Sequence, residues 1–320
     1  MVRALAPALF VIGVLVTGCG GSHPTPTEAD MAACTNNRDD DNDGLVDCHD
    51  SDCAVFQVCR HDAGVLDADL DAPMSDAGPC SAPLDIVLVV DVSTSMASDI
   101  AAIRAGIGSV WDAAHALTED TQISMVVFVD DVLAVDASQP PLSTGGHCVP
   151  FASASDIETH LVAWQMFCAT NQSPVSHIQN HDCAENSLDA IMVATACPVR
   201  TGSTRVILHV TDDTFAERPA VLSGAFGGGV RVQFNFVETL TMLTDHQYHV
   251  GVFAESGVGD DCGAGRSPDV GRGFSGPYGG MLSLPDATGG HFWDLRQVRA
   301  GNIDMTQTIG DFLREVYCGP

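Results

Sequence analysis

The sequence contains no lysine, and its 13 basic residues, all arginines, are outnumbered by 42 aspartates and glutamates. The formal net charge at pH 7 is −29. Such an acidic excess argues against nucleic acid and anionic headgroups as binding partners, because both would be repelled, and it favours divalent metal ions. Hydrophobic residues still make up 45% of the 320 residues. That share is enough for one good-sized hydrophobic core and a small additional module.

Apolar runs long enough to cross a membrane are also lacking, although a shorter run opens the sequence. Arg3 precedes the apolar residues 4–16, which is the pattern of a targeting segment and too short for a spanning helix. The segment Val16-Thr17-Gly18-Cys19 at its end resembles a bacterial lipobox. This resemblance implies removal of residues 1–18 and attachment of lipid to Cys19. An ordinary secretory signal with an incidental cysteine is the alternative.

The cysteine content also indicates export. Twelve cysteines fit an oxidising compartment, where disulfides persist. Eleven remain once Cys19 carries lipid, so at least one thiol is free or pairs with another chain. Gly20 stands where an aspartate retains some bacterial lipoproteins in the inner membrane. We therefore expect a lipid-anchored protein of the bacterial cell envelope, in the outer membrane or at the cell surface.

Composition divides the rest of the chain into four segments. Residues 19–33 form a polar tether, and residues 34–59 form a small cysteine-rich module. Residues 60–79 are dominated by Asp, Ala, Gly and Pro without apolar periodicity, which predicts an extended acidic linker. The main domain is expected over residues 80–320.

The cysteine-rich module contains an acidic loop with the spacing of a calcium site. Gly44 stands where such loops turn sharply, and oxygen ligands are spaced around it at Asp39, Asp41, Asp43, Asp47 and Asp50. Because the last ligand is Asp rather than Glu, the loop resembles dockerin or thrombospondin type 3 repeats. Disulfides among the flanking cysteines could replace a missing core. A structural Ca²⁺ is expected, and a solvated acidic run is the alternative.

Apolar periodicity in the main domain predicts an α/β fold. Short runs rich in β-branched residues, typical of central parallel strands, occur at 86–90, 123–129, 206–210 and 248–253. Helical spacing of apolar residues occurs between and after them, at 97–117, 155–167, 184–197 and 305–316. Alternating strands and helices predict a doubly wound, mostly parallel sheet flanked by helices, with function at the carboxyl ends of its strands.

The first of these strands ends in Asp91-Val-Ser93-Thr-Ser95. Where a buried strand turns into a helix, a carboxylate and two hydroxyls can converge at the carboxyl edge of the sheet. No histidine is close in the sequence, so these groups make a poor nucleophile–base pair. They are good hard ligands for Mg²⁺ or Mn²⁺. The alternative is that Asp91 or Ser93 merely caps the helix.

This motif resembles the metal-ion-dependent adhesion site of von Willebrand factor type A (VWA) domains, which are doubly wound α/β modules that bind proteins through a metal ion. Two further positions match. Glu185 lies at the start of the predicted helix 184–197, and Asp212 ends the third predicted strand. Most type A domains have Thr at the position of Glu185. A Glu at this position resembles the variant found in integrin β subunits. The resemblance implies a metal site at Asp91, Ser93, Ser95, Glu185 and Asp212.

The integrin-like resemblance implies two further cation sites. An auxiliary site that would take Ca²⁺ corresponds to Asp130, Asn180, Asp182 and Glu185, with the Ala184 carbonyl as another ligand. Solvated loop charges are the alternative there. A third site is only half present, because Asp99 matches but Ser98 stands where a carboxylate is expected.

The resemblance covers residues 80–318, and the ends of type A domains lie together. It therefore favours a disulfide between Cys80 and Cys318, which would close a very long loop. The insertion at 131–180 has two cysteines, Cys148 and Cys168, and is expected to be stapled. His177 and His181 near Cys183 could bind Zn²⁺, although no helix is predicted there. His209, in the middle of a strand, is expected to be a satisfied core residue.

The function expected from these observations is adhesion. A metal ion with an open coordination position would bind an Asp or Glu carboxylate of a protein partner, and the lipid would hold the chain on a membrane. The alternative is a structural envelope or surface scaffold whose metals only stabilise the fold. No Ser-His-Asp signature, zinc-protease helix or phosphate loop is evident, so an enzyme is not expected.

Overall fold

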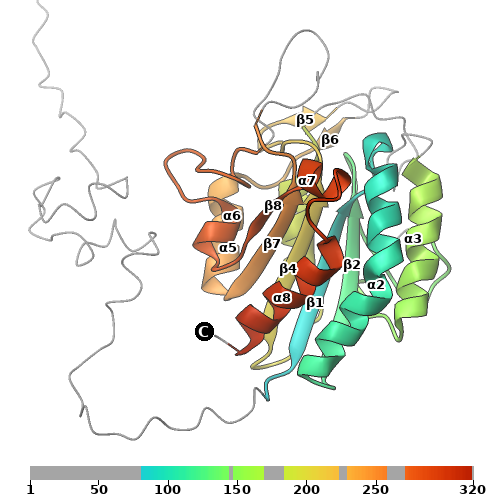
Figure 1. The fold of residues 1–320 in the computed structure, drawn as a ribbon. Helices are drawn as coiled ribbons and strands as arrows, with labels where there is room; N and C mark the ends of the chain where they lie inside the picture. Colours follow the sequence, from blue (N-terminus) through green and yellow to red (C-terminus); the bar gives the residue numbers. More distant parts are fainter. Residues whose placement is uncertain (1–80, 144–146, 169–183, 223–228, 258–270, 319–320) are drawn as a thin grey trace, which may run out of the picture. The chain divides into compact units, whose positions relative to one another are not determined.

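The computed structural model of the chain describes residues 81–143, 147–168, 184–222, 229–257 and 271–318 (Figure 1). The chain divides into two units, Met1–Ala63 and Gly64–Pro320, and every described residue belongs to the second. The expected signal, tether, calcium loop and linker, together with Cys19 and Cys80, therefore lie outside the described residues. The boundaries expected for them stay predictions.

A six-stranded sheet forms the centre of the second unit, in the order β3-β2-β1-β4-β7-β8. Neighbouring strands are parallel except at β3, which pairs antiparallel with β2 at one edge. The strands are β1 (Leu84–Asp91), β2 (Thr121–Phe128), β3 (Val132–Ala134), β4 (Thr204–Thr211), β7 (Tyr248–Ala254) and β8 (Phe292–Asp294). A separate antiparallel pair is formed by β5 (Val221–Leu222) and β6 (Val230–Arg231).

Helices cover both faces of the sheet (Figure 1). One face carries α2 (Ala97–Leu117), α3 (Ala154–Cys168) and α8 (Met305–Cys318). The other carries α4 (Ser187–Thr195), α5 (Phe236–Asp245) and α6 (Leu284–Ala287). A short 3-10 helix, η4 (Thr94–Met96), connects β1 to α2, and α7 (Leu295–Arg299) follows β8 directly. None of the helices in the described ranges combines the length and apolarity that crossing a membrane requires.

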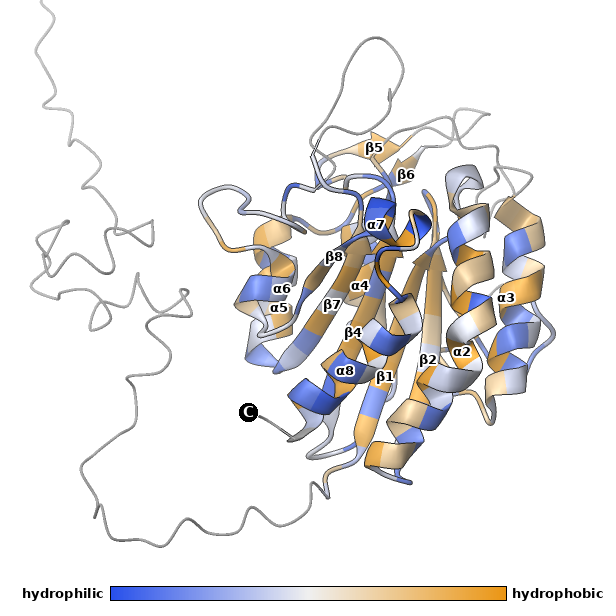
Figure 2. Cartoon of the chain, in the orientation of Figure 1, coloured by the Kyte–Doolittle hydropathy of each residue, from blue (hydrophilic) through white to orange (hydrophobic). Residues whose placement is uncertain are grey.

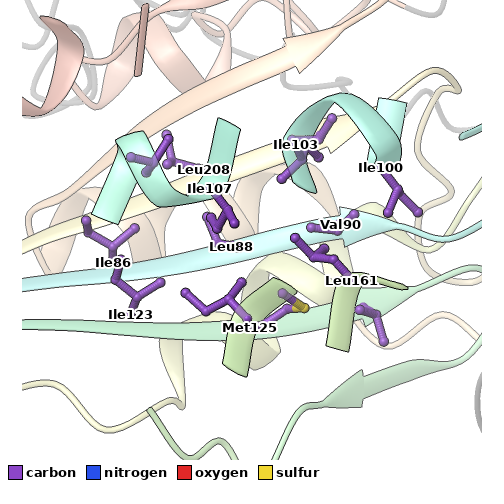
Figure 3. Packing of buried hydrophobic residues seen from close by; sticks show 14 of the residues in the cluster. Ile86, Leu88, Val90, Ile100, Ile103, Ile107, Ile123, Met125, Leu161 and Leu208 are labelled. Atoms are coloured by element: carbon purple, nitrogen blue, oxygen red, sulfur yellow. The ribbon is translucent and has the colours of Figure 1, made fainter. Parts of the chain in front are cut away.

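The alternation of side chains along β1 divides the core into two layers. Ile86, Leu88 and Val90 pack toward α2 and α3, where they meet Ile100, Ile103, Ile107 and Leu161 (Figure 3). Val87 and Val89 point to the opposite face and pack with α4 and α5. Burying each such side chain contributes about 1.5–3 kcal/mol. Because both faces are covered, the central strands are apolar along most of their length (Figure 2).

The predicted α/β fold is confirmed. All four predicted strands and all four predicted helices are present, α2 with the predicted bounds and the others shifted by a few residues. A further strand, β8, lies at the edge of the sheet opposite β3. We did not predict α5, α7 or the antiparallel β3. A five-residue helix and a three-residue strand are too short for apolar periodicity to reveal.

A disulfide links the insertion after β3 to the segment after α4, rather than two cysteines of the insertion to each other. Cys148 forms a disulfide with Cys197, which follows α4, and Cys168 is buried with a free thiol. The sequence did not predict this pairing, because connectivity depends on which segments the fold brings together. Cys318 closes α8, but its side chain and Cys80 lie outside the described part, so their disulfide stays a prediction.

Strand order determines where a site can form. β1 lies between β2 and β4, because the chain first winds to one side of β1 and then returns to continue on the other. Such a reversal opens a crevice at the carboxyl ends of the two strands where the winding changes direction, since their connections leave in opposite directions. In this chain those strands are β1 and β4, so Asp91 and Asp212, which end and follow these strands, lie at this point of reversal.

Candidate metal centre

Asp91 is the last residue of β1, and its side chain is fully buried. Its Oδ1 accepts a hydrogen bond from the Ser93 backbone N–H at 2.7 Å, and its Oδ2 accepts one from the Thr211 hydroxyl at 2.7 Å. Burial, reinforced by the nearby charge of Asp212, raises the pKa of Asp91 to about 8. A carboxylate in this position therefore needs a cation beside it to stay ionised at neutral pH.

The two serines of the motif lie side by side. The hydroxyl oxygens of Ser93 and Ser95 are 3.1 Å apart, and Ser95 Oγ donates to Asp212 Oδ1 at 2.9 Å. Ser93 is buried, whereas Ser95 is exposed, so the cluster opens to solvent on the Ser95 side. Ser93 precedes η4 but makes no side-chain capping bond, and neither does Met96 before α2. The alternative that this motif merely caps a helix is therefore not supported.

Asp212 approaches Ser95 from β4, the strand on the other side of the point where the winding of the sheet reverses (the switch point). It directly follows β4, and its side chain is mostly buried. While its Oδ1 accepts from Ser95, its Oδ2 accepts from Arg299 Nη2 at 2.8 Å. Two carboxylates and two hydroxyls from separate chain segments thus converge at the carboxyl ends of β1 and β4, as the sequence motif predicted.

Glu185 lies in the segment before α4 and is buried. Its backbone N–H donates to the Thr214 carbonyl at 2.9 Å, which ties this segment to the chain after β4. Burial, followed by the charge of Asp91, raises the pKa of Glu185 well above its usual value. Ala184, just before it, has φ 98°, a conformation that L-residues rarely adopt and that recurs at functional sites.

Two of the residues predicted for the auxiliary site, Asp130 and Glu185, lie in the described part of the chain. Asp130 is buried near the end of β2, and its backbone carbonyl accepts from Asn186 Nδ2 at 2.8 Å. The charge of Asp130 contributes to the raised pKa of Glu185, so the two carboxyls are neighbours. Asn180 and Asp182 lie outside the described residues, as do the alternative zinc ligands His177, His181 and Cys183.

The donor set suits a hard cation that accepts hydroxyl ligands. In the described ranges, no group of three or more His, Cys, Asp and Glu side chains comes close enough together to hold a metal ion. An ion at Asp91 and Asp212 would therefore depend on the serine hydroxyls. Oxygen ligands of this kind, with water in the remaining positions, fit Mg²⁺ or Mn²⁺ better than zinc.

Several residues around the centre were not predicted. Thr211 bonds to Asp91, and Asp213, beside Asp212, has its pKa raised to about 6, mainly by burial. Arg299 and Glu255 approach from the segments after β8 and β7. Thr211 and Asp213 had a signal in the sequence, because they directly flank the predicted ligand Asp212. The others come from short or irregular segments without a motif.

Comparison with known proteins matches this part of the chain to one family. The family model of the integrin beta chain VWA domain matches residues 79–233. Integrin beta-2 of Ovis canadensis is 28% identical over 144 residues, and that of Bos taurus is 27% identical over the same length. These matches cover 42% of this chain but only 18% of each integrin, so most of the integrin chain has no counterpart in the match.

Two solved bacterial structures share part of the arrangement at low identity. An aerotolerance-related membrane protein from Bacteroides fragilis is 15% identical with a TM-score of 0.42, and the match covers 72% of this chain and 99% of that one. The pilus adhesin SpaC from Lactobacillus rhamnosus GG is 13% identical with a TM-score of 0.41. That match covers 74% of this chain and 30% of the adhesin.

Proposed function

We propose that this chain, whose second unit contains a VWA domain, is a binding protein that holds a carboxylate of a protein partner through a divalent metal ion. The ion would be Mg²⁺ or Mn²⁺ held by Asp91, Ser93, Ser95 and Asp212, with Glu185 acting directly or through water. The observation that carries the proposal is the convergence of these oxygens at the switch point, where Ser95 bridges Ser93 and Asp212. The integrin beta match supports it.

The geometry favours an acidic partner. The centre is open to solvent at the exposed Ser95, while Asp91 is buried. A hard divalent ion with two carboxylates and two hydroxyls keeps a coordination position for an outside ligand, and it prefers an oxygen anion there. The chain's own net charge of −29 would repel an acidic partner elsewhere, so the metal centre would give such a partner its point of attachment.

A binding role is favoured over catalysis by the partners of the serines. Their hydroxyls bond to each other and to a carboxylate, rather than to a histidine that could act as a base. The alternative function is a structural scaffold whose metals only stabilise the fold. Calcium at residues 39–50, and at Asp130 with Asn180, Asp182 and Glu185, is proposed on the sequence pattern and the resemblance.

The first test is metal binding itself. Titration of the purified chain with Mn²⁺, followed by electron paramagnetic resonance of the free ion, should show that Asp91→Ala binds one Mn²⁺ fewer than the unchanged chain. The matched control is Asp112→Ala on the exposed side of α2, which should bind as many ions as the unchanged chain. An Asp91→Ala variant that keeps all its Mn²⁺ would contradict the proposed ligand set.

The second test separates adhesion from a scaffold role. Peptide pairs that differ only by Asp or Asn at one position would be screened against the immobilised chain in Mn²⁺ and in EDTA. Adhesion predicts peptides that bind in Mn²⁺ only when Asp is present, and that lose binding to Asp91→Ala. If Mn²⁺ raises the melting temperature of the chain but no peptide shows this dependence, the scaffold function is the better one.

A further inference from the structure

Arg299, the last residue of α7, makes a three-way ion pair beside the candidate metal centre. Its Nη2 lies 2.6 Å from Asp99 Oδ2 and 2.8 Å from Asp212 Oδ2, and its Nη1 donates to Glu255. The three carboxylates come from α2, from the end of β4 and from the end of β7. One guanidinium thus joins elements that are far apart in the sequence.

Asp99 depends on this arginine. Its side chain is only 2% exposed, and a buried carboxylate without a cation is strongly unfavourable. Arg299 Nε donates to both oxygens of Asp99, at 3.0 and 3.2 Å, while Nη2 provides the 2.6 Å contact. Two nitrogens of the planar guanidinium therefore face one carboxylate, an arrangement that an arginine can make and a point charge cannot.

The guanidinium is held in place by its own helix. Arg296, one turn earlier, pairs with Glu255 at 2.8 Å and donates to the Ser256 carbonyl at 2.8 Å. The Asp294 side chain accepts from the Arg296 backbone N–H at 2.9 Å and from Ser256 Oγ at 2.7 Å. These contacts fix α7 against the segment after β7, so Arg299 is a fixed part of the site and not a free surface side chain.

We infer that the guanidinium of Arg299 occupies the third cation site permanently. Asp99 therefore binds this guanidinium and no divalent ion. Asp99 is the residue that the integrin-like resemblance would assign to a third metal, and Ser98 leaves that site one carboxylate short. The structure supplies the missing charge from the protein. The residues at this position therefore do not fit a third metal ion. The inference goes beyond the proposed adhesion and holds whether or not Asp91 binds metal.

The two carboxylate oxygens of Asp212 also have different partners. Arg299 holds Oδ2, and Ser95 holds Oδ1 on the side of the candidate metal centre. Arg299 is therefore a positioning residue for Asp212, and it restricts divalent ions to one side of this carboxylate.

Counting bound ions in Asp99→Asn tests the inference in an otherwise unchanged site. Equilibrium dialysis against Ca²⁺ or Mn²⁺ followed by elemental analysis should give the same number of ions per chain as the unchanged protein. The loss of one ion would show that Asp99 is a metal ligand and would overturn the inference. This variant keeps the pairs of Arg299 with Asp212 and Glu255, so we expect it to fold.

The complementary variant is Arg299→Gln, which leaves three carboxylates without their shared cation. We expect it to bind one Ca²⁺ more than the unchanged chain and to melt at a temperature that depends more steeply on Ca²⁺. Arg296→Gln is the matched control, because Arg296 contacts Glu255 but neither Asp99 nor Asp212, and it should gain no ion. A folded Arg299→Gln without the extra ion would overturn the inference. If that variant does not fold with Ca²⁺, the Asp99→Asn count decides.

These outcomes are independent of the adhesion centre. Asp91→Ala should lose the Mn²⁺ of the main site, yet Asp99→Asn added to it should cause no further loss. Failure of the proposed adhesion centre would appear in the Asp91→Ala count and in the peptide screen, whereas failure of the Arg299 inference would appear in the Asp99→Asn and Arg299→Gln counts.

Discussion

His209 lies in the middle of β4, fully buried between the rings of Phe128 and Phe274, whose centroids are 5.5 and 5.2 Å away. Its position in the core is confirmed, but its expected hydrogen bonds are not. Neither ring nitrogen has a hydrogen-bond partner in the described part of the chain. Burial lowers the pKa of His209 to about 3, so the imidazole is neutral at physiological pH.

This shift predicts acid sensitivity at the scale of one residue. The unfolded chain takes up a proton near the ordinary pKa of 6.5, while the folded chain resists it down to about 3. The stability that His209 contributes is therefore nearly complete above pH 6.5 and is lost as the pH falls toward 3, at about 1.4 kcal/mol per pH unit.

The measurement is urea unfolding of the unchanged chain and of His209→Phe at pH 7 and pH 5. Between these values the unchanged chain should lose roughly 2 kcal/mol more than the variant, because phenylalanine keeps the aromatic contacts without the proton. Carboxylates titrate in both proteins and cancel in the comparison. Equal losses would show that His209 does not resist protonation in the fold.

At the scale of elements, the disulfide between Cys148 and Cys197 joins the insertion after β3 to the end of α4. The two cysteines are 49 residues apart in sequence. Glu185 and Asn186 lie just before α4, so the link also restrains the helix that follows these residues of the candidate site. The sequence allowed other pairings, and proximity in the fold selected this one.

Removing this link should destabilise the second unit. A bridge closing a loop of this length contributes about 2–4 kcal/mol, chiefly by restricting the unfolded chain. Cys148→Ala and Cys197→Ala should each lose this amount in urea unfolding. The double variant should lose hardly more than either single one, because the same bond is removed. Additive losses would mean that the cost comes from side-chain packing and not from the bond.

Elements differed in how well the sequence predicted them. α2 and α8 were predicted because long amphipathic helices repeat the apolar pattern over several turns. α7 has five residues, and two of them are arginines, so its sequence carries no apolar repeat. It is nevertheless the element that brings Arg299 to the candidate metal centre. Its position depends on contacts with the segment after β7, which no local pattern encodes.

At the scale of the whole molecule, the chain joins an expected targeting segment and acidic segments to a folded α/β unit whose first part matches the integrin beta chain VWA domain. The domain has its candidate centre at the carboxyl edge of the sheet, and the expected lipid site is near the start of the chain. Anchoring at Cys19 would place the binding centre at the surface of a membrane. We propose this location on the lipobox resemblance at residues 16–19.

Anchoring predicts a result for the full chain expressed in a bacterium fed with an alkyne-labelled palmitate. The chain should carry the label and fractionate with membranes, because attached acyl chains partition into lipid. Cys19→Ala should lose the label and leave the membrane fraction, whereas Cys34→Ala should keep both. Label retained by Cys19→Ala would exclude Cys19 as the anchor.

The sequence by itself determined the fold class, the four main strands and helices, and the candidate ligands at the strand ends, Asp91, Ser93, Ser95 and Asp212. These properties follow from apolar periodicity and from local motifs at strand ends, which are written in neighbouring residues. Only the tertiary structure decided the pairing of Cys148 with Cys197 and the place of Arg299 between Asp99 and Asp212. Both depend on which distant segments pack together, and a buried charge selects its partner by position in space rather than by distance along the chain.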